Sequence, residues 1–168
     1  TGLYAAIAIQ AALLERDRSG LGQKIDLSLY DSAVSTLINI GSNYLMSGEI
    51  PARLGNAHAN IVPYQTFKTS DGEMVVAVGN DQQFQNLCAI LGVPELSGDA
   101  RFETNPKRVE NRKELITLLQ KIFETRPTDF WIGECRRRNI PCGPIQNLEQ
   151  VAKDPQLKAR GIFLECEH

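Results

Sequence analysis

The residues best suited to contact a small ligand lie in a short polar segment near the middle of the chain. This segment is built from small or polar residues without an apolar period, so we expect an ordered loop whose backbone a ligand can approach closely. A loop imidazole such as His58 can hydrogen-bond a carboxylate or a phosphate. The candidate contact residues are Gly55, Asn56, His58 and Asn60. From these residues alone, a plain connector between subdomains is slightly favoured over a lid above a small-molecule site.

The four cysteines do not form a recognisable chemical motif. Cys88, Cys135, Cys142 and Cys166 contain no CxxC pair and lack the histidine partners of a zinc site. We therefore expect no metal, and free thiols in a reducing compartment such as the cytoplasm or the mitochondrial matrix. Cys88 lies on the apolar face of a predicted helix without a neighbouring His or Lys to lower its pKa, so we expect a buried structural role.

A β-hairpin is predicted directly after the polar segment. Tyr64–Thr69 alternates between apolar and polar residues, Ser70-Asp71-Gly72 has turn chemistry, and Met74–Val78 is a continuous run suited to a buried strand. We expect this hairpin to hold the preceding loop in place.

The chain before the loop has the pattern of part of an α/β unit. Residues 2–17 predict a helix that is apolar almost all round and must pack against a large partner. Two glycines then end it, and Lys24–Leu29 alternates as a short strand. Asp31 can cap a second helix that runs to about Met46, a role that we favour over a catalytic one.

The chain after the hairpin predicts a small, mostly helical subdomain. Helices are expected from Asp81, over Asn111–Glu124, and around Trp131, which we expect to be a core anchor. Thr128 is the predicted N-cap of the last of these helices. Three further features are expected beyond the subdomain: a rigid turn at Asn139–Ile145, a short helix at Leu148–Leu157 and a strand at Ile162–Cys166.

Composition and charge exclude several classes of protein. The chain of 168 residues is 42% hydrophobic and 23% charged, which is typical of a soluble globular protein. A net charge of −2, without a basic stretch longer than Arg136–Arg138, argues against nucleic-acid binding. No apolar run is long enough to span a membrane, and the start is not a signal peptide. Because the chain opens on Thr1-Gly2 and ends in a predicted strand, we expect it to be part of a longer protein.

Six blocks of sequence, taken together, carry a family resemblance. They are TGLYAAIAIQAALL, GLGQKIDLSLYDS, RLGNAHANIVPYQTFKTSDG, VGNDQQF, IPCGPI and DPQLKARG. In this order and at this spacing, they resemble the middle of a family III CoA-transferase of the CaiB/BaiF type. That family includes formyl-CoA transferase and succinyl-CoA:glutarate CoA-transferase. Each block alone would be weak evidence for the family, but the six together cover nearly the whole chain.

The resemblance implies the fold of the complete protein. It implies a large Rossmann-like α/β domain, an α+β small domain inserted between its two portions, and two chains interlocked as a homodimer. This template predicts four segments: residues 1–46 as the end of the first large-domain portion with a linker helix, 47–61 as a loop or linker, 62–145 as the small domain of hairpin and helices, and 146–168 as a return linker toward the C-terminal large-domain portion.

The resemblance also implies the transfer of CoA between carboxylic acids. In the family, an aspartate attacks the donor thioester and forms an acyl-aspartyl anhydride, then a thioester to CoA and a second anhydride. That aspartate precedes the TG pair, so we expect the nucleophile upstream of Thr1, no catalytic residue in this chain, and no activity of this chain alone. An acyl-CoA and a carboxylic acid are the implied substrates, and no covalently bound cofactor is expected.

The loop has a counterpart in the family. Arg53–Val62 matches a region that in some relatives is glycine-rich and folds over the bound thioester, which shields the anhydride from water. This chain has His58 and Ile61–Pro63 where those relatives are glycine-rich, which argues against the same mobility. The blocks VPYQTFKTSDG and VGNDQQF look most like the branch that uses dicarboxylates.

Two alternatives to a transferase stay open. One is a non-catalytic module that oligomerises through its first helix. The other is an acyl-CoA racemase-type relative, whose base would come from sequence outside this chain; the NAHANIVPYQ block fits transferases better.

Overall fold

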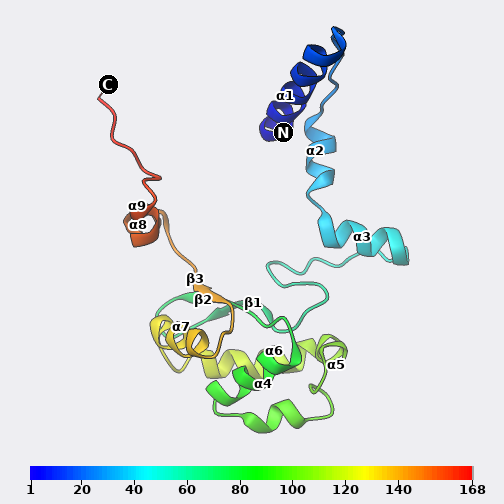
Figure 1. Ribbon diagram of the computed structural model, residues 1–168. Helices are drawn as coiled ribbons and strands as arrows, with labels where there is room; N and C mark the ends of the chain where they lie inside the picture. The colour runs from blue at the N-terminus through cyan, green and yellow to red at the C-terminus, as the bar shows by residue number, and fades with distance from the viewer. Residues whose placement is uncertain (168) are drawn as a thin grey trace. The chain divides into compact units, whose positions relative to one another are not determined.

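The computed structural model describes residues 1–167. These residues divide into two compact units, the first formed by Thr1–Arg53 and the second starting at Leu54. Figure 1 shows the elements of each unit in chain order. Within the described part of the chain, no helix combines the length and the apolar character that crossing a membrane requires.

The first unit consists of helices joined by irregular segments. Its helices are α1 (Gly2–Ser19), α2 (Leu29–Ser35) and α3 (Ile38–Ser47). The helix predicted for residues 2–17 is confirmed, and it ends at Gly20, whose left-handed backbone (φ 71°) lets its N–H donate to the Arg16 carbonyl. No residue of α1 is buried within residues 1–167, and Leu3 and Leu14 are 83% and 68% exposed. Among the described residues, the apolar side chains of α1 therefore stay exposed, although its sequence predicts packing against a large partner.

Three predictions for the first unit are wrong. Lys24–Leu29 forms no strand: residues 24–28 are irregular and Leu29 already begins α2. A strand needs a neighbour for its backbone N–H and C=O groups, and every strand of the described chain lies in the second unit. The single helix expected up to Met46 is interrupted between α2 and α3. Its N-cap is Ser28, whose Oγ accepts from the Asp31 N–H at 2.9 Å, and not Asp31 itself.

The second unit contains an antiparallel sheet with strand order β1-β2-β3. Its strands are β1 (Tyr64–Lys68), β2 (Glu73–Ala77) and β3 (Cys142–Pro144). The predicted hairpin is confirmed, with Thr66 opposite Val75. The rigid turn predicted for Asn139–Ile145 is wrong in part, because its centre pairs with β2. β3 lies at the edge of the sheet, where a proline without an N–H is tolerated.

Helices gather on one side of the sheet (Figure 1). They are α4 (Asp81–Ile90), the 3-10 helix η1 (Pro94–Gly98), α5 (Asn105–Glu110), α6 (Arg112–Phe123) and α7 (Thr128–Arg137). α6 packs on β1, and α7 packs on β2 and β3. The predictions of α4, α6 and the helix around Trp131 are confirmed. α5 is not among the predicted helices. Pro106 has the character of a helix breaker, but proline fits the first turn of a helix, where an N–H has no partner to bond.

The core of the second unit lies between the sheet and these helices. Trp131 is 3% exposed and its Nε1 donates to the Phe123 carbonyl at 2.8 Å, so its predicted role as a core anchor is confirmed. The residues with the largest fully buried apolar side chains are Phe67, Phe84, Phe102, Phe123, Met74, Leu87, Leu115 and Leu119.

The C-terminal segment differs from its prediction in two ways. Two short helices, α8 (Leu148–Lys153) and α9 (Pro155–Ala159), replace the single helix expected over Leu148–Leu157. The break is Asp154, whose extended backbone is the conformation that a following proline favours, and whose carboxylate caps α9. Ile162–Cys166 forms no strand, and no described strand pairs with it.

Asp71 joins the hairpin turn to α7. Its Oδ1 accepts from the Thr128 N–H at 2.8 Å, from Thr128 Oγ1 at 2.9 Å and from Thr69 Oγ1 at 3.1 Å. The N-cap of α7 is Pro127, so the prediction of Thr128 as N-cap is wrong. The capping acceptor comes from the hairpin because Pro127 has no side-chain oxygen to offer.

We predict that Asp71→Asn lowers the stability of the fold at neutral pH. The N–H of Thr128 and then its hydroxyl hold the pKa of Asp71 below its ordinary value of 3.8. A folded pKa below the unfolded one means that the stabilisation is present above the unfolded pKa and is lost as the pH falls through the folded value. Urea midpoints at about pH 7 and about pH 2 measure this: the difference from wild type should be present at the first and shrink at the second.

Asp129→Asn is the matched control, because Asp129 lies in the same first turn of α7. We expect its urea midpoint to stay closer to that of wild type at neutral pH. If Asp71→Asn lowered the urea midpoint equally at both pH values, the stabilising role of the Asp71 carboxylate would be contradicted.

Candidate functional site

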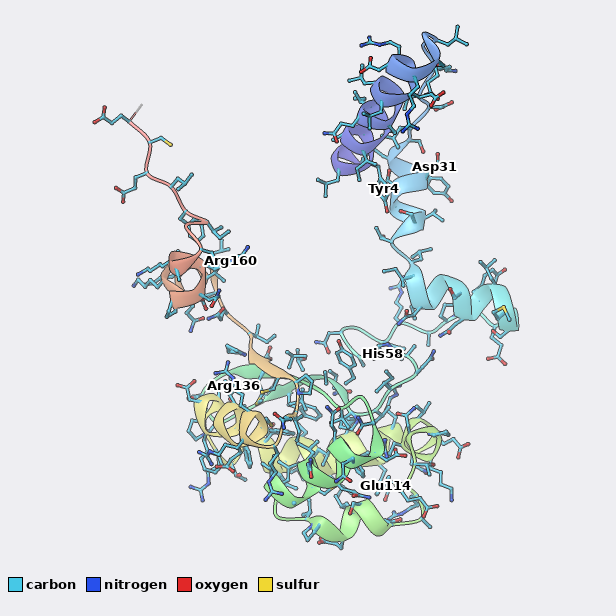
Figure 2. All side chains as sticks on the ribbon, viewed as in Figure 1. Tyr4, Asp31, His58, Glu114, Arg136 and Arg160 are labelled. Carbon is cyan, nitrogen blue, oxygen red and sulfur yellow. The ribbon has the colours of Figure 1, made fainter. Side chains whose placement is uncertain are left out.

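The four predicted contact residues lie in one ordered loop, Leu54–Pro63, which leads into β1. Figure 2 labels His58 on this loop. Gly55 has φ 62°, in the left-handed region that favours glycine, and the Ala57 N–H donates to the Leu54 carbonyl at 3.1 Å to close a turn there. The expected ordered loop is therefore present.

Asn56 and His58 make contacts toward β1. The Asn56 side chain donates from Nδ2 to Thr66 Oγ1 at 2.6 Å and accepts from the Thr66 N–H at 3.3 Å. The His58 ring stacks on Tyr64, with centroids 5.2 Å apart, and its Nδ1 accepts from the Asn60 N–H at 3.1 Å. The His58 N–H donates to the Tyr64 carbonyl at 2.9 Å. These contacts join His58 to Asn60 and attach Asn56 and His58 to β1, so each has a defined place in the loop.

Side chains from α5 and α6 hold the backbone of the same loop. Asn105 Nδ2 donates to the Asn60 carbonyl at 2.8 Å, and Asn105 Oδ1 accepts from the Val62 N–H at 3.1 Å. Arg112 Nη2 donates to the Ala59 carbonyl at 2.7 Å. Partial burial lowers the pKa of Arg112 below its ordinary value of 12.5, but the guanidinium stays charged at neutral pH.

Arg108 lies beneath the loop with no exposed surface. Its Nε donates to the Val62 carbonyl at 2.8 Å, its Nη1 to the Phe102 carbonyl at 3.0 Å and its Nη2 to Asp81 Oδ1 at 2.8 Å. The guanidinium also lies over the Phe84 ring, 4.4 Å from the centroid. A buried cation is tolerated only when it is paired and hydrogen-bonded, and Arg108 meets both conditions.

Asn105, Arg108 and Arg112 are not among the contact residues predicted from the sequence. A local signal existed only for Asn105 and Arg108, which are three positions apart and therefore share one face of α5. Pro106 hid this signal by suggesting that no helix covers residues 105–110, and Arg112 lies in the separate helix α6.

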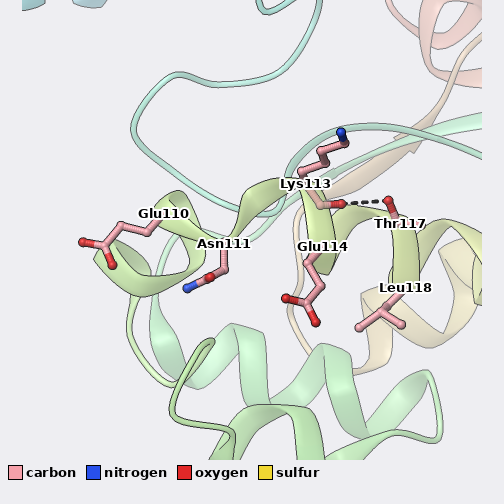
Figure 3. A pocket seen from close by; sticks show the side chains of 6 residues that line it. All are labelled: Glu110, Asn111, Lys113, Glu114, Thr117 and Leu118. Atoms are coloured by element: carbon pink, nitrogen blue, oxygen red, sulfur yellow. Dashed lines mark hydrogen bonds between the residues drawn. The ribbon is translucent and has the colours of Figure 1, made fainter.

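A pocket of about 480 Å³ lies elsewhere in the second unit, at the start of α6 (Figure 3). Its lining residues are Glu110, Asn111, Lys113, Glu114, Thr117 and Leu118. None of the four predicted contact residues lines it. The Thr117 hydroxyl donates to the Lys113 carbonyl at 2.7 Å, and Glu114 pairs with Arg101. These polar groups therefore already have partners on the protein surface. We assign no chemistry to this pocket.

All four cysteines are free. Burial raises the pKa of the Cys88 thiol to about 12, and burial together with the neighbouring Cys142 raises that of Cys135 to about 12. Such thiols are protonated at neutral pH and are poor nucleophiles. The predicted structural role of Cys88 is confirmed, since it is fully buried in the core. Residues 1–167 contain no group of three or more potential metal ligands close together.

A small antiparallel sheet backed by helices and preceded by an ordered polar loop is a recognisable part of a larger fold. A solved CaiB/BaiF family protein from Brucella suis is 48% identical, with a TM-score of 0.76 over 96% of this chain and 43% of that chain. The model of CoA-transferase family III matches residues 1–168. The chain therefore belongs to CoA-transferase family III.

Two curated relatives have closely similar names. The human succinyl-CoA:glutarate CoA-transferase is 45% identical over 168 residues, which is 100% of this chain and 38% of the relative. The succinate–glutarate CoA-transferase of Agrobacterium fabrum is 43% identical over 168 residues, which is 99% of this chain and 42% of the relative. The chain thus spans about two-fifths of the length of the curated relatives it matches.

Proposed function

We propose that the complete protein containing this chain transfers CoA between two carboxylic acids, with an acyl-CoA and a free carboxylate as substrates. The observation that carries this proposal is the family match over residues 1–168, together with 45% and 43% identity to two relatives named for succinate and glutarate transfer. We take dicarboxylic acids as the substrate class on the strength of those names.

The proposed mechanism is an exchange through covalent intermediates on an aspartate located before Thr1. Its carboxylate attacks the acyl-CoA thioester, forms an acyl-aspartyl anhydride and releases the CoA thiolate, which then attacks the aspartyl carbonyl and releases the donor acid. The acceptor carboxylate next attacks the aspartyl-CoA thioester, which forms a second anhydride and releases the CoA thiolate. The thiolate then attacks the acceptor's acyl carbonyl, which gives the new acyl-CoA and frees the aspartate carboxylate. An anhydride is about as reactive as the thioester it replaces, so each step is close to balanced.

This chain's proposed contribution is the small domain and its loop. In this proposal residues 1–46 end the first large-domain portion, 47–61 form the linker, 62–145 the small domain and 146–168 the return. Gly55, Asn56, His58 and Asn60 would then lie beside the bound thioester. The exposed apolar side chains of α1 support a setting in which other segments cover this helix, as in a homodimer. The free thiols support a reducing compartment, the cytoplasm or the mitochondrial matrix.

The test is a transfer assay on the complete protein. We expect incubation with succinyl-CoA and glutarate to yield glutaryl-CoA and succinate, measured by mass spectrometry, and residues 1–168 alone to yield none because they lack the nucleophile. Failure of the complete protein to move CoA to any member of a panel of monocarboxylic and dicarboxylic acids would overturn the proposal. Turnover by residues 1–168 alone would contradict the placement of the nucleophile.

A further inference from the structure

The backbone of residues 59–62 is held by side chains from α5 and from the start of α6. We call Asn105, Arg108 and Arg112 the loop clamp. Its four hydrogen bonds to the loop use the carbonyls of residues 59, 60 and 62 and the N–H of residue 62, at distances between 2.7 and 3.1 Å. Two of the three clamp side chains are cationic, and hydrogen bonds from a charged donor are stronger than neutral ones.

Movement of this loop would disrupt buried polar groups. Arg108 is fully buried, so a loop that lifted away would leave its Nε without the Val62 carbonyl. Val62 itself is 1% exposed and belongs to the core, so the C-terminal end of the loop is also anchored by apolar packing. Both effects disfavour an open conformation, because buried polar groups without partners and exposed core side chains are each unfavourable.

We propose that Asn105, Arg108 and Arg112 are positioning residues, which hold residues 59–62 as a fixed wall of the acyl-CoA site instead of a mobile lid. The inference that the loop is fixed rests only on the contacts described above. Its consequence for catalysis rests on the proposed function: a wall that stays in place keeps water from the acyl-aspartyl anhydride, whereas a loosened wall lets water attack the acyl carbonyl and release the free acid.

Hydrogen exchange of the complete protein tests the fixed loop. Arg112→Met removes the donor to residue 59, and Asn105→Asp removes the donor to residue 60 while keeping the acceptor for the Val62 N–H. Loss of such a bond predicts about tenfold faster amide exchange in the peptide covering residues 54–63. Exchange in β1 and β2 should stay at the wild-type rate. Arg108 is left unchanged in this experiment because its loss would destabilise the whole domain and speed exchange outside the loop as well.

Two controls separate the clamp from general destabilisation. Asp71→Asn weakens the fold at α7 and does not contact the loop, so the loop should exchange no faster than the rest of its domain. Arg112→Lys keeps a charged donor and should recover part of the protection. Loop exchange in the wild type as fast as in an unstructured peptide, or unchanged loop exchange in both clamp variants, would overturn the proposal.

The catalytic consequence is measured as the ratio of hydrolysis to transfer, with succinyl-CoA and glutarate as probes. We expect Arg112→Met to raise this ratio about tenfold and Asp71→Asn to leave it unchanged, since a merely less stable enzyme loses both activities together. Wild-type transfer with unchanged ratios in the clamp variants would overturn the positioning role and leave the proposed function intact. Absence of wild-type transfer would instead overturn the proposed function, and hydrogen exchange would still decide on the fixed loop.

Discussion

Replacing Arg108 with Met is expected to lower the free energy of unfolding by about 2–6 kcal/mol, because two buried carbonyls lose their donor at about 1–3 kcal/mol each. The carbonyls of Val62 and Phe102 lose their donor in a part of the core that excludes water, and Asp81 loses its ion-pair partner. The thioether cannot replace any of these bonds. Urea denaturation of the chain, followed by the fluorescence of its single tryptophan, Trp131, measures the change.

Two further variants separate the geometry of Arg108 from its charge. Arg108→Lys keeps the charge, but its compact ammonium lacks the planar fork that serves three acceptors and stacks on Phe84, so we expect an intermediate loss of stability. Arg101→Met removes an exposed arginine that pairs with Asp99 and Glu114, and it should change the urea midpoint little. Equal effects of Arg101→Met and Arg108→Met would show that burial of Arg108 does not matter.

Phe123→Ala is expected to cost about 3–5 kcal/mol of stability, as do other truncations of fully buried aromatic side chains. The Phe123 ring stacks on Phe67, with centroids 4.6 Å apart, and meets the edge of Trp131 at 5.3 Å. Truncation therefore leaves a cavity where the sheet, α6 and α7 meet. The hydrogen bond from Trp131 Nε1 goes to the backbone carbonyl of Phe123, so the substitution keeps that acceptor and tests packing. Urea denaturation again provides the measurement.

Phe130→Ala is the matched control for this prediction. Phe130 also contacts Trp131, at 5.1 Å between ring centroids, but it is 43% exposed. Because water can replace much of what this ring touches, we expect a loss of about 1 kcal/mol or less. A loss for Phe130→Ala as large as that for Phe123→Ala would mean that the core is centred elsewhere.

The elements that could be predicted are those whose signals are local. The hairpin follows from alternation on either side of Ser70-Asp71-Gly72, and α4 and α6 follow from apolar residues at helical spacing. The end of α1 at Gly20 is local too, because glycine tolerates the left-handed backbone that stops a helix. In each case the residues that decide the structure lie within a few positions of one another.

The elements that could not be predicted depend on distant partners. Lys24–Leu29 and Ile162–Cys166 have strand-like patterns, but residues 1–167 offer them no neighbouring strand to bond. Cys142–Pro144 has a turn-like pattern and pairs because β2 presents an open edge. The cap of α7 by Asp71 joins positions far apart in the chain.

The candidate site shows the same division between local and distant signals. Polar character and Gly55 identify the loop locally, and Asn56, His58 and Asn60 remain predicted contact residues. The burial of Arg108 depends on groups contributed by three other segments, the loop, the residues before α5 and α4, which no local pattern encodes.

Because β2 is the central strand and β3 comes late in the chain, the sheet is incomplete during part of translation. β1 and β2 are adjacent in the chain and can pair as soon as both have left the ribosome, but β3 follows only after all of α4–α7 has been made. At about 5–20 residues per second, that delay is on the order of seconds. During this interval one edge of β2 has unpaired backbone groups and can join strands of other molecules. We expect the exposed edge of β2 to be covered once Cys142–Pro144 has left the ribosome. A nascent chain stalled before Cys142 should therefore associate with chaperones more than a chain stalled well after Pro144.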